Sequence, residues 1–221
     1  MGIFKKTNAN IPEFWKAYEK SFDAKPIADI SKTEFVVLDT ETTGFDYERD
    51  RILSIGAILL KNNCIAINKS LEIFLQQKHY NSETVKIHGI LKKGKIKKVS
   101  EIDALRQFLE YLENRVIVAH HAHFDMTMLN KALKRNGLPR LKNEVLDTVN
   151  LYKKTLIRSN LLEKKENYSL DELADKFSIS KKDRHTAMGD AYITAIAFLK
   201  IIRKLNDKNQ ITLKNLLAVG Y

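Results

Sequence analysis

The chain has 221 residues, which is enough for one compact domain with a short extension and a substantial core. Its longest apolar stretch, residues 191–199, is far too short to span a bilayer, and its first residues lack the pattern of a secretory signal. A single cysteine, Cys64, excludes an internal disulfide and fits a reducing, cytoplasmic setting.

The charge of the chain is strongly basic. Lysine and arginine number 38 against 27 aspartate and glutamate residues, which gives a formal net charge of +11. Such a charge attracts polyanions, and nucleic acid is the commonest of them. A lysine-rich surface without such a partner is the alternative interpretation. The run KKGKIKK at residues 92–98 is a candidate phosphate-contacting loop.

The first part of the chain predicts one helix and then strands. Aromatic residues at helical spacing predict a helix over residues 11–23, with its aromatics covering the core; these are Phe14, Trp15, Tyr18 and Phe22. The predicted strands cover residues 34–39, 51–60 and 64–75, with a hairpin turn at residues 61–63. Three consecutive strands with short links predict an antiparallel meander.

Strands alternating with helices follow in the second part. The predicted helices cover residues 101–113, 125–136 and 186–205, a capped helix begins at Ser169, and short strands cover residues 115–119 and 145–147. This pattern is typical of a mixed α/β layer fold. We expect an N-terminal helical extension at residues 1–32, the main domain at 33–205 and a short C-terminal segment at 206–221, whose leucines suggest a helix folding back.

Acidic residues occupy positions that should be apolar. Side chains alternate along a strand, so Asp39 and Glu41 would share one face at the carboxyl end of the first strand. Asp125 and Asp190 lie on the core-facing stripes of their helices, near the first turns. A buried carboxylate without a partner is destabilising by several kcal/mol, roughly, even after relaxation. These four acids therefore need compensating charge.

The negative charge of a single buried acid could be compensated in more than one way. A helix N-terminus favours an anion, and a buried lysine or arginine could pair with it. Four inward carboxylates would need several buried cations, whereas divalent metal ions satisfy them more simply. Ligands that are all oxygen favour Mg²⁺ or Mn²⁺. His185, five residues before Asp190, is placed as a general base, although a lone histidine is more often a surface or core residue.

Three segments resemble the motifs of the DEDDh family of 3′→5′ exonucleases. They are FVVLDTETTG at residues 35–44, VAHHAHFD at 118–125 and HTAMGDA at 185–191. Their order and separation also match the family, and the likeness runs from about residue 33 to 205. Within the family, the pattern resembles the proofreading epsilon subunit of bacterial DNA polymerase III and its stand-alone relatives.

The resemblance implies a fold, a site and a reaction. The fold would be a ribonuclease-H-like α/β fold, with three antiparallel strands and then parallel strands flanked by helices. Two Mg²⁺ or Mn²⁺ ions would be held by Asp39, Glu41, Asp125 and Asp190, with His185 as general base. Thr42 would hold the 3′-terminal sugar, and the nucleotide pocket would be lined by His88, His120 and Phe124. The reaction would release nucleoside 5′-monophosphates from DNA, as in proofreading or repair.

Alternatives stay open beside this interpretation. A stand-alone exoribonuclease or oligonucleotide nuclease would share every catalytic residue. A non-catalytic nucleic-acid-binding subunit and a metal-stabilised scaffold are the non-enzyme alternatives. His121 stands where family members often carry asparagine, so His120, His121 and His123 with Asp125 could form a zinc site. Adjacent histidines on a strand point to opposite faces, which argues against that site.

The expected partners are single-stranded DNA or RNA 3′ ends, and no membrane. A polymerase or repair protein is a further candidate partner. Residues 206–221 are short, so we expect no attachment to a polymerase through a C-terminal tail. The aromatic N-terminal helix, with Phe14, Trp15 and Tyr18, is the better candidate for such a docking surface.

Overall fold

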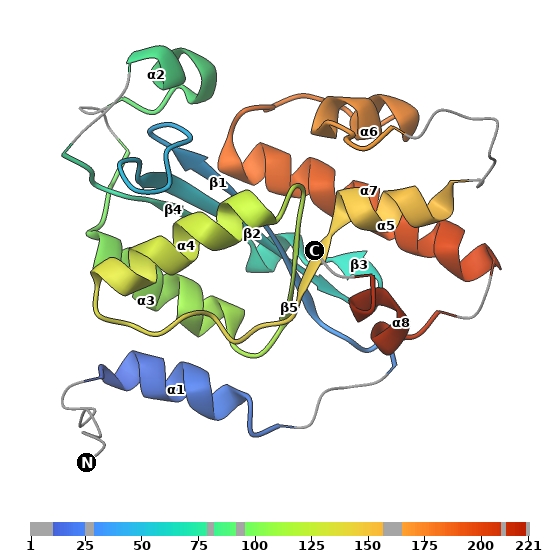
Figure 1. Ribbon diagram of the computed structural model, residues 1–221, viewed down its shortest axis with the longest axis horizontal. Helices are drawn as coiled ribbons and strands as arrows, with labels where there is room; N and C mark the ends of the chain where they lie inside the picture. Colours follow the sequence, from blue (N-terminus) through green and yellow to red (C-terminus); the bar gives the residue numbers. More distant parts are fainter. Residues whose placement is uncertain are drawn as a thin grey trace, which may run out of the picture.

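A computed structural model gives the structure of the chain for residues 11–24, 29–78, 82–91, 96–156, 165–208 and 211–219. One six-stranded sheet crosses it, with helices packed on both faces (Figure 1). The strands are β1 (Phe35–Thr42), β2 (Ile52–Lys61), β3 (Cys64–Ile65), β4 (Leu71–Phe74), β5 (Val116–Ala119) and β6 (Val145–Asp147). Most of the lysine-rich run, residues 92–95, lies outside the described ranges, as do residues 1–10 of the N-terminal extension.

The order of the strands confirms the mixed sheet. The path is β3-β2-β1-β5-β6, and β4 pairs with β2 on the same edge as β3. β1 is antiparallel to β2, and β2 is antiparallel to β3 and β4. β5 and β6 then add to β1 in parallel. The antiparallel meander and the parallel second half are therefore both confirmed.

The predicted third strand at residues 64–75 was wrong as one element. Ile65 pairs with Leu60 and Leu71 pairs with Ala57, so residues 66–70 exceed the length of β2 that lies opposite them. The surplus forms a 3-10 turn, η1 (Ile67–Lys69), between β3 and β4. The segment from Asn68 to Ser70 is polar and its neighbour Ile67 is 69% exposed, so little apolar burial holds it in the sheet.

Two hydrophobic cores lie on the two faces of the sheet. The first is covered by α1 (Glu13–Ser21), α3 (Glu101–Leu112) and α4 (His123–Arg135). The second is covered by α5 (Thr148–Thr155), α6 (Leu170–Lys176), α7 (Ala187–Lys208) and α8 (Leu213–Leu217). β1 separates them, because Val36 and Leu38 point into the first core whereas Phe35 and Val37 point into the second.

Two helices of the structure were not predicted from the sequence. α2 (Ser82–His88) stands beside the carboxyl end of β1, where the Thr84 hydroxyl donates a hydrogen bond of 3.4 Å to the carbonyl of Thr43 (Figure 1). α5 follows β6 directly and is capped by Asp147, whose carboxylate accepts from the Val149 backbone N–H at 2.8 Å. Both are short, so neither shows a sustained apolar period.

The terminal segments both pack on the domain. Trp15 and Tyr18 of α1 are buried, and the Tyr18 hydroxyl donates to Asn143 Oδ1 at 2.6 Å. The prediction that these aromatics cover the core is confirmed for Trp15 and Tyr18, whose buried side chains are not open to a partner. The use of α1 as a docking surface stays a prediction. Leu213 and Leu216 of α8 are also buried, which confirms that this helix folds back. Within the described ranges, no helix has the length and apolar character needed to cross a membrane.

Candidate active site

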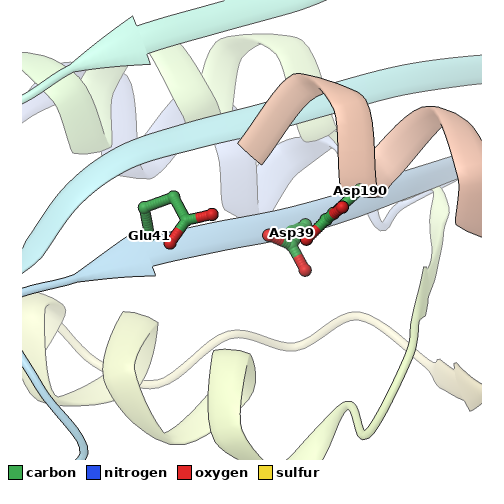
Figure 2. Close-up of side chains that lie close together, drawn as sticks. All are labelled: Asp39, Glu41 and Asp190. Carbon is green, nitrogen blue, oxygen red and sulfur yellow. The ribbon is translucent and has the colours of Figure 1, made fainter. Parts of the chain in front are cut away.

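Three carboxylates converge at the carboxyl end of β1. Asp39, Glu41 and Asp190 each offer an oxygen, and these oxygens all lie within 4.8 Å of one another. Figure 2 shows the side chains of Asp39 and Asp190 meeting beside β1, with Glu41 farther along the strand. Asp39 and Glu41 are partly buried and Asp190 is buried. The prediction that Asp39 and Glu41 share one face of β1 therefore matches the structure, and the structure adds that α7 lies on this face.

The backbone at Gly56 lets α7 approach the sheet closely. A Cβ atom at this position of β2 would lie 2.3 Å from the carbonyl carbon of Ala187, in the first turn of α7. No side chain fits there, so α7 packs directly against the strand that neighbours β1. Because Asp190 lies one turn further into α7, this contact brings its carboxylate to the acids of β1.

Asp125 reaches the same end of β1 from the opposite face of the sheet. β5 pairs with β1 only as far as Val37, so the backbone of Thr40 has no strand on that side. Asp125 Oδ1 fills the place, accepting from the Thr40 N–H at 2.9 Å and the Thr40 hydroxyl at 2.7 Å. Asp125 is buried and is not among the three acids whose oxygens lie within 4.8 Å.

The start of α4, which carries Asp125, is fixed by a fifth acid. Asp147 Oδ2 accepts a hydrogen bond of 2.9 Å from the Ala122 N–H, just before α4. Its other oxygen caps α5, so Asp147 connects the ends of two helices and one strand. The sequence analysis did not single out this residue. Its position at the end of a short apolar strand is the same pattern that drew attention to Asp39.

Burial and mutual repulsion raise the pKa of each acid. Burial raises the pKa of Asp39 well above its usual range, and the carboxylates of Asp125, Asp190 and Glu41 raise it further. Burial and then Asp190 raise the pKa of Glu41 to about 8. Burial also raises the pKa of Asp125 to about 7, with Asp147 adding to it. The cluster therefore favours protons or other cations at neutral pH.

The donor set fits a hard divalent cation. The converging ligand atoms are carboxylate oxygens, which Mg²⁺ and Mn²⁺ prefer. Among the residues that the structure describes, His120, His121 and His123 belong to no such metal-binding group. The Nδ1 atom of His120 instead lies 2.8 Å from the Thr148 hydroxyl oxygen. The acids can hold a metal ion, and the alternative zinc site has no counterpart in this geometry.

The loop before α7 is held in a tight conformation. Asp183 and His185 both adopt φ 64°, a region that residues other than glycine rarely occupy. The Thr186 hydroxyl donates to the Asp183 carbonyl at 2.7 Å and accepts from the Gly189 N–H at 3.0 Å. His185 is exposed, and its backbone N–H donates to Asp190 Oδ1 at 3.3 Å. This conformation keeps His185 next to the acid cluster.

Arg184, in the same loop, supplies a positive charge that the sequence analysis did not identify. Its guanidinium donates to Asp190 Oδ2 and to both oxygens of Asp171 in α6. Only its place directly before His185 could have drawn attention to it. A buried arginine is one of the two ways, beside a metal ion, in which the sequence could compensate a buried carboxylate. Here one arginine is bonded to two acids, Asp171 and Asp190.

The predicted substrate-binding residues lie in different surroundings. The Thr42 hydroxyl is buried and donates to the Gly44 carbonyl at 2.7 Å. His88 is buried at the end of α2, where its Nδ1 accepts from the Ile90 N–H at 3.0 Å. Burial, followed by the nearby His121, lowers the pKa of His120 to about 3, so it is neutral. These three side chains are held by the fold and have little freedom to rearrange.

Phe124 belongs to an aromatic cluster with two further residues that were not predicted as site residues from the sequence. Its ring centroid lies 5.7 Å from Phe45 and 5.8 Å from Tyr47, both in the turn after β1. Phe45 is 80% exposed, the highest exposed fraction among the large apolar side chains of the described residues. No pattern in the sequence singles out Phe45, because its exposure is seen only in the structure.

The raised pKa values predict a pH-dependent stability of the metal-free protein. The folded state keeps a proton on Glu41 up to about pH 8, whereas the unfolded chain loses it near pH 4. Stability from this group therefore falls as pH rises from 5 to 8, by up to about 1.4 kcal/mol per pH unit. Denaturant unfolding in EDTA should show wild type losing stability relative to Glu41→Gln over this range. A constant difference between the two proteins would contradict the raised pKa of Glu41.

Comparisons with known proteins show the family to which the chain is related. The sequence model of the exonuclease family (RNase_T) matches residues 36–198. The PolC-type DNA polymerase III of Caldanaerobacter subterraneus subsp. tengcongensis is 36% identical over 176 residues, 79% of this chain. That of Thermotoga petrophila is 32% identical over 189 residues, 86% of this chain. The chain spans only 12% and 13% of the lengths of these relatives.

Solved structures show the same fold at low identity. Exonuclease X in complex with 5′ overhanging duplex DNA has a TM-score of 0.62 and 19% identity, covering 84% of this chain and 98% of that one. E. coli exonuclease I in complex with a dT13 oligonucleotide has a TM-score of 0.63 and 19% identity, covering 81% of this chain and 42% of that one. The family match covers most of the chain, and together with the PolC-type relatives it confirms the DEDDh resemblance: the chain belongs to the exonuclease family.

Proposed function

We propose that the chain is a 3′→5′ exonuclease that uses two divalent ions, Mg²⁺ or Mn²⁺, and releases nucleoside 5′-monophosphates from DNA. The observation that carries this proposal is the convergence of Asp39, Glu41 and Asp190 within 4.8 Å, with Asp125 beside them. The raised pKa values indicate that these acids lack enough positive charge of their own. Membership of the exonuclease family supplies the reaction class.

Four carboxylates would hold the metal ions in this proposal. Asp39, Glu41 and Asp190 supply the oxygens that lie closest together. Asp125 is the fourth ligand; its Oδ1 is committed to Thr40, so Oδ2 is the oxygen that would reach a metal ion. When bound, such ions lower the pKa of water and stabilise charge on the attacking and leaving oxygens of a phosphodiester. Thr40 and the β1 backbone keep the ligand set rigid.

His185 is the proposed general base. It is exposed beside the acid cluster and is not one of the residues whose ligand atoms converge. A histidine in this place can take a proton from the attacking water and pass it to solvent. The tight loop that positions its backbone against Asp190 Oδ1 would hold the imidazole near the reacting atoms.

The DNA end would lie against the aromatic and basic surroundings of the site. Phe45, Tyr47 and Phe124 form an aromatic surface at the carboxyl end of β1, and an exposed ring can stack on a terminal base. The net charge of +11 favours binding of phosphates without reading sequence. By family resemblance, Thr42 would hold the terminal sugar, and His88 and His120 would line the nucleotide pocket.

DNA as substrate and a polymerase as partner rest on relatives. The PolC-type relatives are DNA polymerases, and two structural neighbours are complexes with DNA. Both observations support a proofreading or repair role, in which the chain acts on single-stranded 3′ ends. An exoribonuclease would use the same acids and the same histidine, so RNA is included in the test.

The polarity and end requirement give the direct test. With Mg²⁺ or Mn²⁺, a 5′-labelled single strand should shorten one nucleotide at a time, because the terminal sugar must enter the site. A circular strand of the same sequence should resist, and Asp190→Asn should be inactive on both. Parallel digestion of matched DNA and RNA should show faster release from DNA. Rapid cutting of the circle would identify an endonuclease instead.

Removal of the proposed base should slow the reaction while metal binding survives. His185→Ala should lower the turnover rate by roughly 10²–10⁴-fold, the usual loss for a general base. Calorimetric titration with Mn²⁺ should give nearly the wild-type affinity, since the imidazole is not a ligand. Lys182→Ala, an exposed neighbour in the same loop, is the matched control and should keep its rate. A mutant with the wild-type rate and pH profile would assign the proton to another group.

A further inference from the structure

Arg184 lies between two acids that come from different helices. Its Nε and Nη2 donate to the two oxygens of Asp171 at 3.0 and 3.1 Å, and its Nη1 donates to Asp190 Oδ2. The side chain of Arg184 is 18% exposed, that of Asp190 is 8% exposed and that of Asp171 is 45% exposed. One end of the guanidinium therefore faces the acid cluster, and the other faces a carboxylate near solvent.

The charge of Arg184 acts on three of the four acids. Burial raises the pKa of Asp39, Glu41 and Asp190, and the Arg184 guanidinium opposes that rise in all three. Among the ion pairs of the described residues, Arg184 is the only lysine or arginine bonded to any of the four acids. It partly neutralises a site that would otherwise hold several uncompensated carboxylates.

This contact conflicts with metal binding. Arg184 bonds to Oδ2 of Asp190, and the His185 backbone N–H donates to Oδ1, so both oxygens are engaged. A divalent ion held by Asp190 would need one of these oxygens. An ion there would lie close to the positive guanidinium, and two like charges repel strongly in a partly buried site. We therefore expect an ion bound at Asp190 to displace the guanidinium, because two cations would otherwise share one carboxylate.

Asp171 provides the place for Arg184 to remain. A bidentate pair with a carboxylate is a strong and geometrically defined contact for arginine. Because the guanidinium is a rigid plane, Nη1 can leave Asp190 only if the pair with Asp171 turns as a unit. The Asp171 side chain is 45% exposed, so it has room to move with Arg184, which would keep one carboxylate partner throughout.

We propose that Arg184 is a built-in counter-ion that occupies Asp190 in the metal-free protein and is displaced when a divalent ion binds, with Asp171 as its anchor. The inference rests on the metal site of the proposed function. It assigns Arg184 a role distinct from the ligands: it stabilises the metal-free fold and weakens the apparent metal affinity. Occupation of the site then depends on the concentration of free metal ion.

Mn²⁺ binding separates this role from a merely structural one. If Arg184 competes with the ion, Arg184→Gln should bind Mn²⁺ about tenfold or more tightly. An adjacent positive charge weakens the affinity of a carboxylate for a proton by roughly 10- to 1000-fold, and we expect a similar effect on a metal ion. If Arg184 only holds the loop in shape, Asp190 loses its position in the variant and Mn²⁺ binds more weakly. Electron paramagnetic resonance of free Mn²⁺ measures the affinity without any turnover.

The matched control removes an equal charge from the same loop. Lys181 pairs with Asp175 at 2.7 Å and bonds to none of the four acids, so Lys181→Gln should change the Mn²⁺ affinity less than twofold, roughly, because salt screens distant surface charge. In EDTA, Arg184→Gln should melt below wild type and gain more from added Mn²⁺. If that variant does not fold without metal, Arg184→Met, which keeps an apolar stem and removes the charge, should bind Mn²⁺ with an affinity above that of wild type.

Each outcome decides the inference. Tighter Mn²⁺ binding in the Arg184 variants supports displacement. Unchanged or weaker binding overturns it, while Mn²⁺ binding by wild type leaves the proposed metal site standing. Failure of wild type to bind Mn²⁺, with Asp190→Asn behaving the same, would overturn the metal site of the proposed function and the inference with it.

Discussion

Repulsion between carboxylates at the carboxyl end of β1 is the constraint on which the rest of the structure depends. Asp39, Glu41 and Asp190 hold their oxygens within 4.8 Å, and Asp125 adds a fourth charge from the other face. Acids free to move would separate. They stay together because each belongs to a helix or strand with its own apolar packing. The packing of the fold therefore offsets the repulsion between the acids, which a bound cation would reduce.

Three local devices keep the acids in place. β1 is paired with β2 along its whole length, from Phe35 to Thr42, which fixes Asp39 and Glu41 on one face. Gly56 has no side chain, so the first turn of α7 reaches β2 and carries Asp190 to β1. Asp125 is bound by Thr40 where β5 no longer covers β1. The chemistry thus occupies the place where the parallel part of the sheet stops.

Periodicity was sufficient to predict the acids and the framework around them. The alternation of β1 put Asp39 and Glu41 together, and helical spacing turned Asp125 and Asp190 toward the core. The capping box at Ser169 and Glu172 marked the start of α6 correctly. The mixed sheet followed from the order of the elements. These features are local, and the physical rules that generate them act over a few residues.

Features that depend on distant residues could not be predicted. Arg184 lies in a loop and pairs with Asp171, thirteen residues away in α6, so no local pattern predicts the contact. The aromatic face of α1 is equally consistent with a core and with a docking surface until Asn143 is seen to accept from Tyr18. The break between β3 and β4 depends on the register against β2. Phe45 becomes notable only once the buried acids are known to lie beside it.

The most direct measurement is anomalous diffraction from crystals of the protein soaked in Mn²⁺. The account expects two Mn²⁺ peaks about 3.5–4 Å apart, bound by oxygens of Asp39, Glu41, Asp125 and Asp190, with Arg184 turned away from Asp190 toward Asp171. Peaks at His120 or His121, or no peak beside β1 at saturating Mn²⁺, would contradict it.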